Sequence, residues 1–110
     1  MVIDHISFAV KDLEEGIRYW NRVFGYRQLT GVVANSLQKV KVVFLCKEDS
    51  INVKLIEPAE DNQSLQNFVN RGGGFQHICF RCDDIRSTMQ DLNAKGLITL
   101  VAPQPGEAFN

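Results

Sequence analysis

Two histidines, His5 and His77, are the only ones in the chain of 110 residues, and they lie 72 positions apart. The imidazole side chain is a frequent ligand of borderline divalent metals and also a good hydrogen-bond donor. A metal site needs three or four donors, so two histidines are too few to form one alone. A shared metal or ligand site and two ordinary hydrogen-bonded histidines are both open at this point.

An internal repeat places the two histidines in equivalent positions. Shifting the chain by 72 residues aligns DHISF at 4–8 with QHICF at 76–80. The alignment continues downstream, where it pairs Asp12 with Asp84, Leu13 with Ile85, Ile17 with Met89, Asn21 with Asn93 and, after a one-residue deletion, Gly25 with Gly96. If the two units pair about a pseudo-two-fold axis, equivalent side chains converge on that axis. The repeat therefore predicts that His5 and His77 approach each other.

Strand alternation indicates which face each histidine occupies. Successive side chains of a strand point to opposite faces, so His5 shares a face with Ser7, and His77 shares one with Cys79. The bulky residues Ile6, Phe8 and Val10 share the other face, which suits packing under a helix. Small neighbours leave space beside each imidazole. We therefore expect the face with His5, Ser7, His77 and Cys79 to line a cavity.

Each unit reads as a strand followed by a capped helix. A strand over 3–10 is followed by Asp12 and Glu15, a pattern typical of a helix start, and Gly25 is placed to end the helix. Leu13, Ile17, Trp20 and Phe24 form its apolar stripe. The remaining predicted elements are strands over 26–33, 39–45 and 51–56, a short helix capped by Ser64, a glycine break at 72–74, a strand over 75–82, a helix over 85–95, a strand over 97–101 and an irregular end from Pro103. The strands over 39–45 and 51–56 are expected to form an antiparallel hairpin.

Composition excludes several classes of protein. Twelve Lys and Arg against thirteen Asp and Glu leave no basic surface for nucleic acid or an anionic membrane. An odd count of three cysteines argues against a disulfide framework and for a reducing compartment. No apolar run is long enough to span a bilayer, and residues 1–5 lack the layout of a signal peptide. We expect a single cytoplasmic domain over residues 1–110.

Three stretches resemble the vicinal oxygen chelate superfamily, which includes glyoxalase I, bleomycin-resistance proteins, extradiol dioxygenases and methylmalonyl-CoA epimerase. They are IDHISFAVKDLE at 3–14, VKLIEP at 53–58 and GFQHICFRCDDI at 74–85, and the epimerase branch looks nearest. The resemblance implies an α+β fold of paired βαβββ units that form an open, cup-shaped mixed sheet. Residues 1–58 are then the first unit, 59–73 a short helix with a glycine-rich hinge, and 74–110 an incomplete second unit.

The resemblance also implies a site for a divalent metal such as Ni²⁺, Co²⁺, Mn²⁺ or Zn²⁺. Its first and third ligand positions fall on His5 and His77, whereas the second falls on Lys54. A protonated lysine is no ligand, and its charge repels a metal ion. The position of the family's catalytic base falls near Val42, and the final Glu ligand has no counterpart. The site therefore departs from the pattern of the family.

The second unit lacks two strands within these 110 residues. Either the sequence is a piece of a longer chain, or a partner chain completes the sheet. An unpaired sheet edge favours association, so we expect a homodimer, which the resemblance also suggests.

Three functions remain open, and they leave undecided whether the protein is an enzyme. The first is a metal-dependent lyase or isomerase acting on a small acid, thioester or α-keto adduct, with His5 and His77 as metal ligands. The second is a non-catalytic protein that binds a small organic anion, with Lys54 as the countercharge and Ser7 and Cys79 lining the site. The third is a scaffold that only dimerises.

Overall fold

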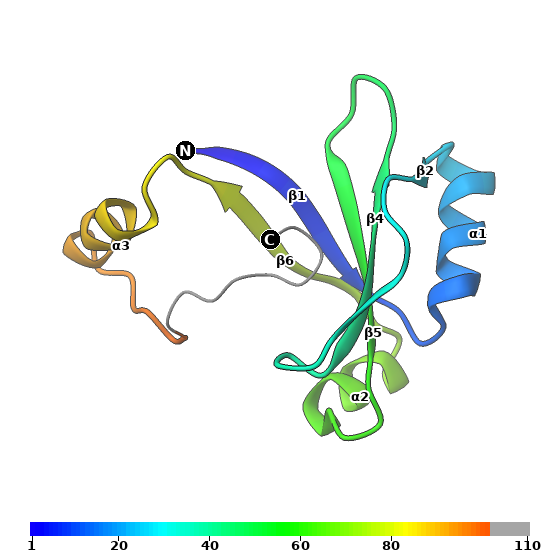
Figure 1. Ribbon diagram of the computed structural model, residues 1–110. Helices are drawn as coiled ribbons and strands as arrows, with labels where there is room; N and C mark the ends of the chain where they lie inside the picture. Colours follow the sequence, from blue (N-terminus) through cyan, green and yellow to red (C-terminus); the bar gives the residue numbers. More distant parts are fainter. Residues whose placement is uncertain (102–110) are drawn as a thin grey trace.

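A computed structural model describes residues 1–101 of the chain. One mixed sheet organises its strands and helices (Figure 1). In chain order they are β1 (Val2–Ala9), α1 (Leu13–Phe24), β2 (Arg27–Gln28), β3 (Val33–Asn35), β4 (Val40–Cys46), β5 (Asn52–Pro58), α2 (Gln63–Asn70), β6 (Gly74–Arg81) and α3 (Ile85–Ala94).

The sheet joins the two units through β1 and β6. Its strand order is β2-β4-β5-β1-β6, with β3 also paired to β4. Strand β1 runs parallel to β5 and antiparallel to β6, while β4 and β5 form the predicted antiparallel hairpin. The α+β fold with an open mixed sheet is therefore confirmed.

Helix α1 forms where the local signals predict it. The Asp12 side chain accepts a hydrogen bond of 3.1 Å from the Glu15 amide, and Gly25 ends the helix with φ of 76°. Helix α1 covers one face of the sheet, where Phe8 packs against the main apolar core. The buried members of that core are Leu13, Tyr26, Val43, Leu45, Val53 and Leu55.

The glycine break lets the chain cross the end of β1 before it enters β6. At Gly73, φ is 64°, and an added Cβ would meet the Ala9 carbonyl oxygen at 2.5 Å. Both the backbone conformation and the close approach require glycine at this position. The predicted break is confirmed, and it allows β6 to pair with β1.

The predicted strand over 26–33 is wrong in its extent. It divides into β2 and β3, and β3 continues to Asn35, beyond the predicted end of the strand. The Thr30 hydroxyl accepts a 3.1 Å hydrogen bond from the Phe44 amide. Since a side chain takes the place of a backbone partner there, the ladder with β4 is interrupted between β2 and β3.

The predicted cap of α2 is also wrong, because Asn62 rather than Ser64 caps the helix. The Asn62 side-chain oxygen accepts a 3.3 Å hydrogen bond from the Leu65 amide. Its side-chain nitrogen donates to the carbonyl oxygens of Gln38 and Lys39, in the turn before β4. Asn62 can use both ends of its amide, so it caps α2 and anchors it to the sheet, whereas Ser64 lies inside the helix.

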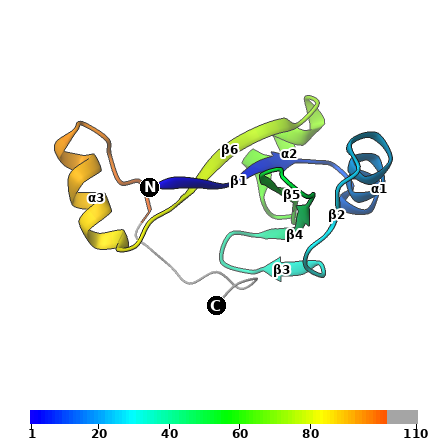
Figure 2. The same ribbon diagram turned by 90° about the horizontal axis from the view of Figure 1, so that it is seen from above.

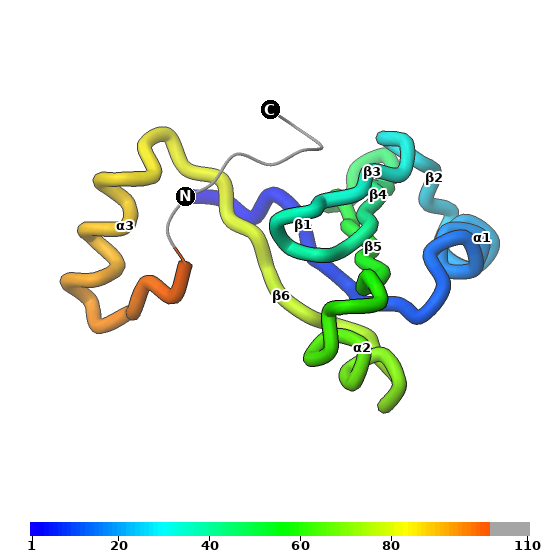
Figure 3. The backbone as a smooth tube through the Cα atoms, turned by 60° about the horizontal axis from the view of Figure 1, so that its bottom comes forward, coloured from blue at the N-terminus to red at the C-terminus, as the bar shows by residue number. Residues whose placement is uncertain are grey.

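The predicted strand over 97–101 does not form. Within the described part of the chain, β6 pairs only with β1, so no second strand offers a ladder to this segment. Helix α3 has no buried residue, and it lies at the opposite end of the molecule from α1 (Figures 2 and 3). The irregular end predicted from Pro103 lies outside the described residues. Within residues 1–101, no helix has both the length and the apolar character needed to cross a bilayer.

Candidate functional site

His5 lies in β1 on the face of the sheet opposite α1, and it is only 6% exposed. Its Nδ1 lies 2.8 Å from an Asp4 carboxylate oxygen, and its ring edge contacts Phe44 with a centroid distance of 5.0 Å. Asp4 also faces the Arg81 guanidinium at 3.5 Å. These contacts fix the orientation of the His5 imidazole.

His77 lies in β6 beside Ser7, its register partner in β1. The His77 Nε2 lies 3.1 Å from the Ser7 hydroxyl, and His77 Nδ1 contacts the side-chain oxygen of Gln76. The ring centroids of His5 and His77 are 6.5 Å apart. The structure therefore brings together the two histidines that the repeat relates, but His77 is only half-buried whereas His5 is enclosed.

Lys54 brings a positive charge to this face. It lies on β5, in register with Ser7 on β1 and with Phe44 on β4. Its Nζ lies 5.5 Å from the centroid of the Phe44 ring, a cation–π contact. Burial lowers the pKa of Lys54 from its ordinary value. Within residues 1–101, none of the ion pairs involves Lys54.

The Lys54 charge acts on the neighbouring groups of β6. Burial lowers the pKa of His77, and the positive charges of Lys54 and His5 lower it further. Cys79 lies in register with His5, and burial together with the Asp4 carboxylate raises the pKa of its thiol. Lys54 acts on that thiol in the opposite direction. Lys54, His77 and Cys79 therefore share one electrostatic environment, although they come from two units.

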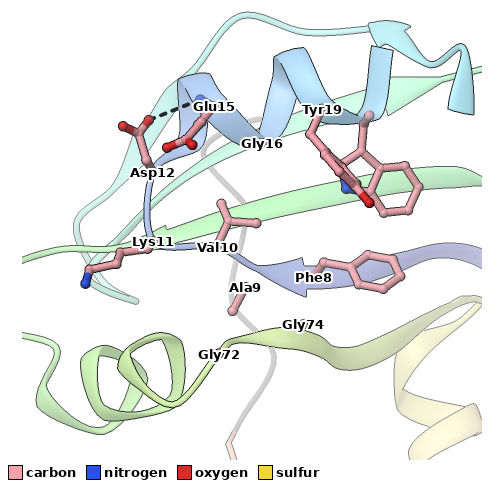
Figure 4. Close-up of a pocket in the computed structure, with 11 residues that line it drawn as sticks. Phe8, Ala9, Val10, Lys11, Asp12, Glu15, Gly16, Tyr19, Gly72 and Gly74 are labelled. Atoms are coloured by element: carbon pink, nitrogen blue, oxygen red, sulfur yellow. Dashed lines mark hydrogen bonds between the residues drawn. The ribbon is translucent and has the colours of Figure 1, made fainter. Parts of the chain in front are cut away.

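A cavity of about 290 Å³ adjoins His77. It lies between the sheet and α2, and its walls include Val40, Ile56, Leu65, Gln76 and His77. A second pocket, of about 360 Å³, lies on the α1 side of the sheet and is lined by Phe8, Val10 and Tyr19 among others (Figure 4). The second pocket is separated by the sheet from the two histidines. The cavity at His77 is therefore the one next to the predicted site.

The profile of the Glyoxalase/Bleomycin resistance protein/Dioxygenase superfamily matches residues 4–109. The chain belongs to this superfamily. The mitochondrial methylmalonyl-CoA epimerase of Dictyostelium discoideum is 29% identical over 105 residues, which cover 94% of this chain and 61% of the relative. The human mitochondrial methylmalonyl-CoA epimerase is 28% identical over 100 residues, covering 89% of this chain and 56% of the relative. The chain thus spans less than two thirds of these curated relatives.

Solved structures of epimerases have the same fold. A variant of Streptomyces coelicolor methylmalonyl-CoA epimerase in complex with 2-nitronate-propionyl-CoA superposes with a TM-score of 0.83 at 26% identity, covering 97% of this chain and 78% of that one. A methylmalonyl-CoA epimerase in complex with methylmalonyl-CoA and NH₄⁺ gives a TM-score of 0.82 at 26% identity, covering 96% and 78%. This member of the superfamily therefore resembles the epimerases in both sequence and fold.

The described residues of this superfamily member do not fit a divalent metal. Nowhere in residues 1–101 do three His, Cys, Asp or Glu side chains come together as a ligand set. The Nε2 of His77 is hydrogen-bonded to the Ser7 hydroxyl. The residue at the second ligand position implied by the resemblance is Lys54, whose ammonium is not a metal ligand. Val42, at the position implied for the base, is a buried apolar residue. The face offers donors and a positive charge rather than ligands for a cation.

Two residues that were not predicted as site residues also shape this site. Phe44 packs against both His5 and Lys54, and Asp4 holds the His5 ring. Alternation within 39–45 places Phe44 on the same face as Val42, so the face that Phe44 occupies could be predicted from the sequence. Its contact with His5 depends on β5 lying between β1 and β4, which only the strand order reveals.

Proposed function

We propose that this protein binds a small organic acid or its thioester on the face that carries His5, Lys54 and His77. The observation that supports this function best is the Lys54 ammonium, which is half-buried and forms no ion pair within residues 1–101. A charge removed from water without a partner is costly, and a bound anion would offset that cost. Ser7 and Cys79 lie on the same face, where the Ser7 hydroxyl orients His77 and the half-buried Cys79 thiol adds a polar atom beside the anion.

The ligands of the relatives support this chemical class. One epimerase structure holds a nitronate analogue of a propionyl-CoA thioester, and another holds methylmalonyl-CoA together with an ammonium ion. In the latter protein an ammonium ion accompanies an acyl thioester that carries a carboxylate. The side chain of Lys54 ends in a group of the same chemistry. A thioester of a dicarboxylic acid is therefore the first ligand to test.

A metal-dependent lyase or isomerase is the second candidate function. The approach of His5 and His77 to a centroid distance of 6.5 Å favours it, as does the similarity to epimerases. This function requires at least one further donor in place of Lys54. It predicts that a divalent ion binds to the protein and that both histidines are required for that binding.

Calorimetric titration separates the two functions. Methylmalonyl-CoA and malonate are titrated into the protein in EDTA, and then Ni²⁺, Co²⁺, Mn²⁺ and Zn²⁺ are titrated without a chelator. Anion binding predicts that Lys54→Gln weakens the binding of either ligand by about tenfold or more, because a charge-assisted hydrogen bond is lost. Lys95→Gln makes the same change of charge at the residue that follows α3 and should have no effect. Unchanged affinity in Lys54→Gln would contradict the proposed function.

We also propose that the protein forms a homodimer. Within the described residues, β6 pairs on one side only, and Phe75, Ile78 and Phe80 are exposed on it. Open edges and exposed apolar side chains favour association between chains. Light scattering after size-exclusion chromatography measures the mass directly, and a monomeric mass at 100 µM, about the concentration used in structural work, would contradict the proposal.

A further inference from the structure

The face between the two histidines carries a positive charge that belongs to the chain itself. Lys54 supplies it from β5, the strand that lies beside β1. The Asp4 carboxylate, which contacts this site, is already engaged by His5 and Arg81. The potential on this face therefore favours an anion and disfavours a second cation.

The position of this charge is fixed by packing. The backbone of Lys54 is in register with both neighbouring strands, and the Phe44 ring lies beneath its ammonium. The same ring contacts His5, so Lys54 and His5 share one apolar support. If the Lys54 side chain turned toward solvent, it would lose the cation–π contact with Phe44.

Both histidines already use ring nitrogens in contacts within the chain, one nitrogen of His5 and both nitrogens of His77. His5 Nδ1 lies against Asp4, and His77 Nε2 lies against the Ser7 hydroxyl. Ser7 is fully buried, so its contact with His77 is protected from water. A metal ion would have to break the contact between Ser7 and His77 and also lie near the ammonium.

We propose that the Lys54 ammonium is a built-in cation of this site, which excludes a divalent metal and itself provides the positive charge for the bound anion. This inference rests on the proposed function for the identity of the anion, but the exclusion of metal does not depend on it. The ligand-binding activity is then independent of metal supply and insensitive to chelators. Replacing the ammonium with a carboxylate should convert the face into a metal site that includes His5 and His77.

Cobalt titration tests the inference on the full chain. Co²⁺ bound to protein ligands has visible absorption bands, which report coordination without any assay of activity. We expect no saturable Co²⁺ binding by the parent protein. We expect Lys54→Glu to bind about one Co²⁺ per chain, and the double variant His5→Ala with Lys54→Glu to lose that binding. Lys95→Glu, which introduces the same change of charge at the residue that follows α3, should behave like the parent.

A second variant keeps the test informative if Lys54→Glu does not fold, as judged by circular dichroism. Lys54→Gln removes the repulsion without adding a charge, and it should show the saturable Co²⁺ binding that the parent lacks. Binding of one Co²⁺ by the parent, lost in His5→Ala, would overturn the inference. So would a folded Lys54→Glu variant that binds no more Co²⁺ than the parent.

The ligand experiment is read separately. Malonate affinity of the parent protein should be the same with EDTA and with added Co²⁺. If malonate binds only when Co²⁺ is present, the proposal that Lys54 replaces the metal is wrong, although the face still binds an acid. If neither malonate nor an acyl thioester binds under any condition, the proposed function fails, while the cobalt result still decides whether Lys54 excludes the metal.

Discussion

The two strand–helix units share a sequence pattern but differ in how they are packed. In the first unit, Leu13 begins α1 and is 2% exposed, whereas its repeat counterpart Ile85 begins α3 and is 49% exposed. Both helices form, and both are capped by an aspartate: Asp12 accepts from the Glu15 amide and Asp84 from the Arg86 amide. Helix α1 covers the β4–β5 hairpin, and the described residues provide no such hairpin for α3. Local signals are therefore sufficient to specify a helix, but burial requires a sheet.

The two histidines show the same difference. His5 is enclosed by Asp4 and Phe44 of the first unit, whereas His77 is half-buried and adjoins a cavity. Equivalent positions in the repeat have thus acquired different surroundings. We expect His5 to contribute more to stability and His77 more to ligand binding.

The largest expected effect concerns the first residue of each helix. Leu13→Ala should lower the free energy of unfolding by about 2 to 4 kcal/mol, because it leaves a cavity in the main core. Ile85→Ala, its counterpart in the repeat, should cost about 0.5 kcal/mol or less, because the side chain is exposed. Urea unfolding measures both values. Equal losses would show that α3 is buried in solution, for example against a second chain.

The next effect separates the histidines. His5→Ala should lower the free energy of unfolding by about 1 to 3 kcal/mol, since it removes a buried ring and leaves Asp4 with one partner fewer. His77→Ala should cost about 1 kcal/mol or less but weaken malonate binding. Urea unfolding and calorimetry on the same two variants test this division. The reverse order of stabilities would contradict the comparison.

The helix caps should differ in the extent of their effects. Asp12→Ala should lower the free energy of unfolding by about 1 kcal/mol, because α1 is part of the cooperative core. Asp84→Ala should instead fray α3 locally, with little change in the global midpoint. Amide hydrogen exchange detects the local change, and urea unfolding detects the global one. A shift of the global midpoint by Asp84→Ala would mean that α3 folds as one unit with the sheet.

The smallest effect concerns Lys54 and pH. Burial lowers the pKa of Lys54 below its ordinary value of 10.5, so between the lowered pKa and 10.5 the unfolded chain binds more protons than the folded one. Stability contributed by this group therefore rises with pH in that window, and the full cost of burying the charge applies at pH 7. Lys54→Met should be more stable than the parent by about 0.5 to 1 kcal/mol at pH 7, although the loss of the cation–π contact reduces the gain.

Unfolding in urea at about pH 7 and pH 10 measures this dependence. The advantage of Lys54→Met should narrow at the higher pH, while Lys95→Met should show no comparable trend. A constant difference at both pH values would indicate that Lys54 is not appreciably desolvated. Loss of malonate binding in the more stable Lys54→Met variant would show that the lysine is retained for function at a cost in stability.

Much of the fold could be predicted because its signals are local. Asp12 and Gly25 mark the ends of α1 through side-chain and backbone preferences that depend on a few neighbouring residues. The errors arose where a distant partner decides the structure. The Thr30 hydroxyl accepts from the Phe44 amide and so interrupts the pairing with β4 at the point between β2 and β3. Asn62 caps α2, and its side-chain nitrogen also donates to the turn before β4. The segment over 97–101 has the composition of a strand, but the described residues offer it no strand to pair with.

The candidate site could be predicted only in part. The repeat relates His5 to His77, and alternation relates His5 to Ser7, so their convergence follows from pattern alone. The partners that orient them do not follow from pattern. Phe44 reaches His5 across β5, and the charge of Lys54 acts on His77 across β1.

The sequence by itself determined the helices, the turns, the alternation of faces and the equivalence of the two histidines, because each depends on residues close together in the chain or on a repeated pattern. Only the tertiary structure decided that α1 is covered by the sheet and that Phe44 supports both His5 and Lys54. It also decided that, among residues 1–101, α3 has no buried residue and the half-buried Lys54 has no carboxylate partner. Burial and electrostatics depend on which strands become neighbours. Strand order is a property of the assembled sheet, so it cannot be read from any single segment.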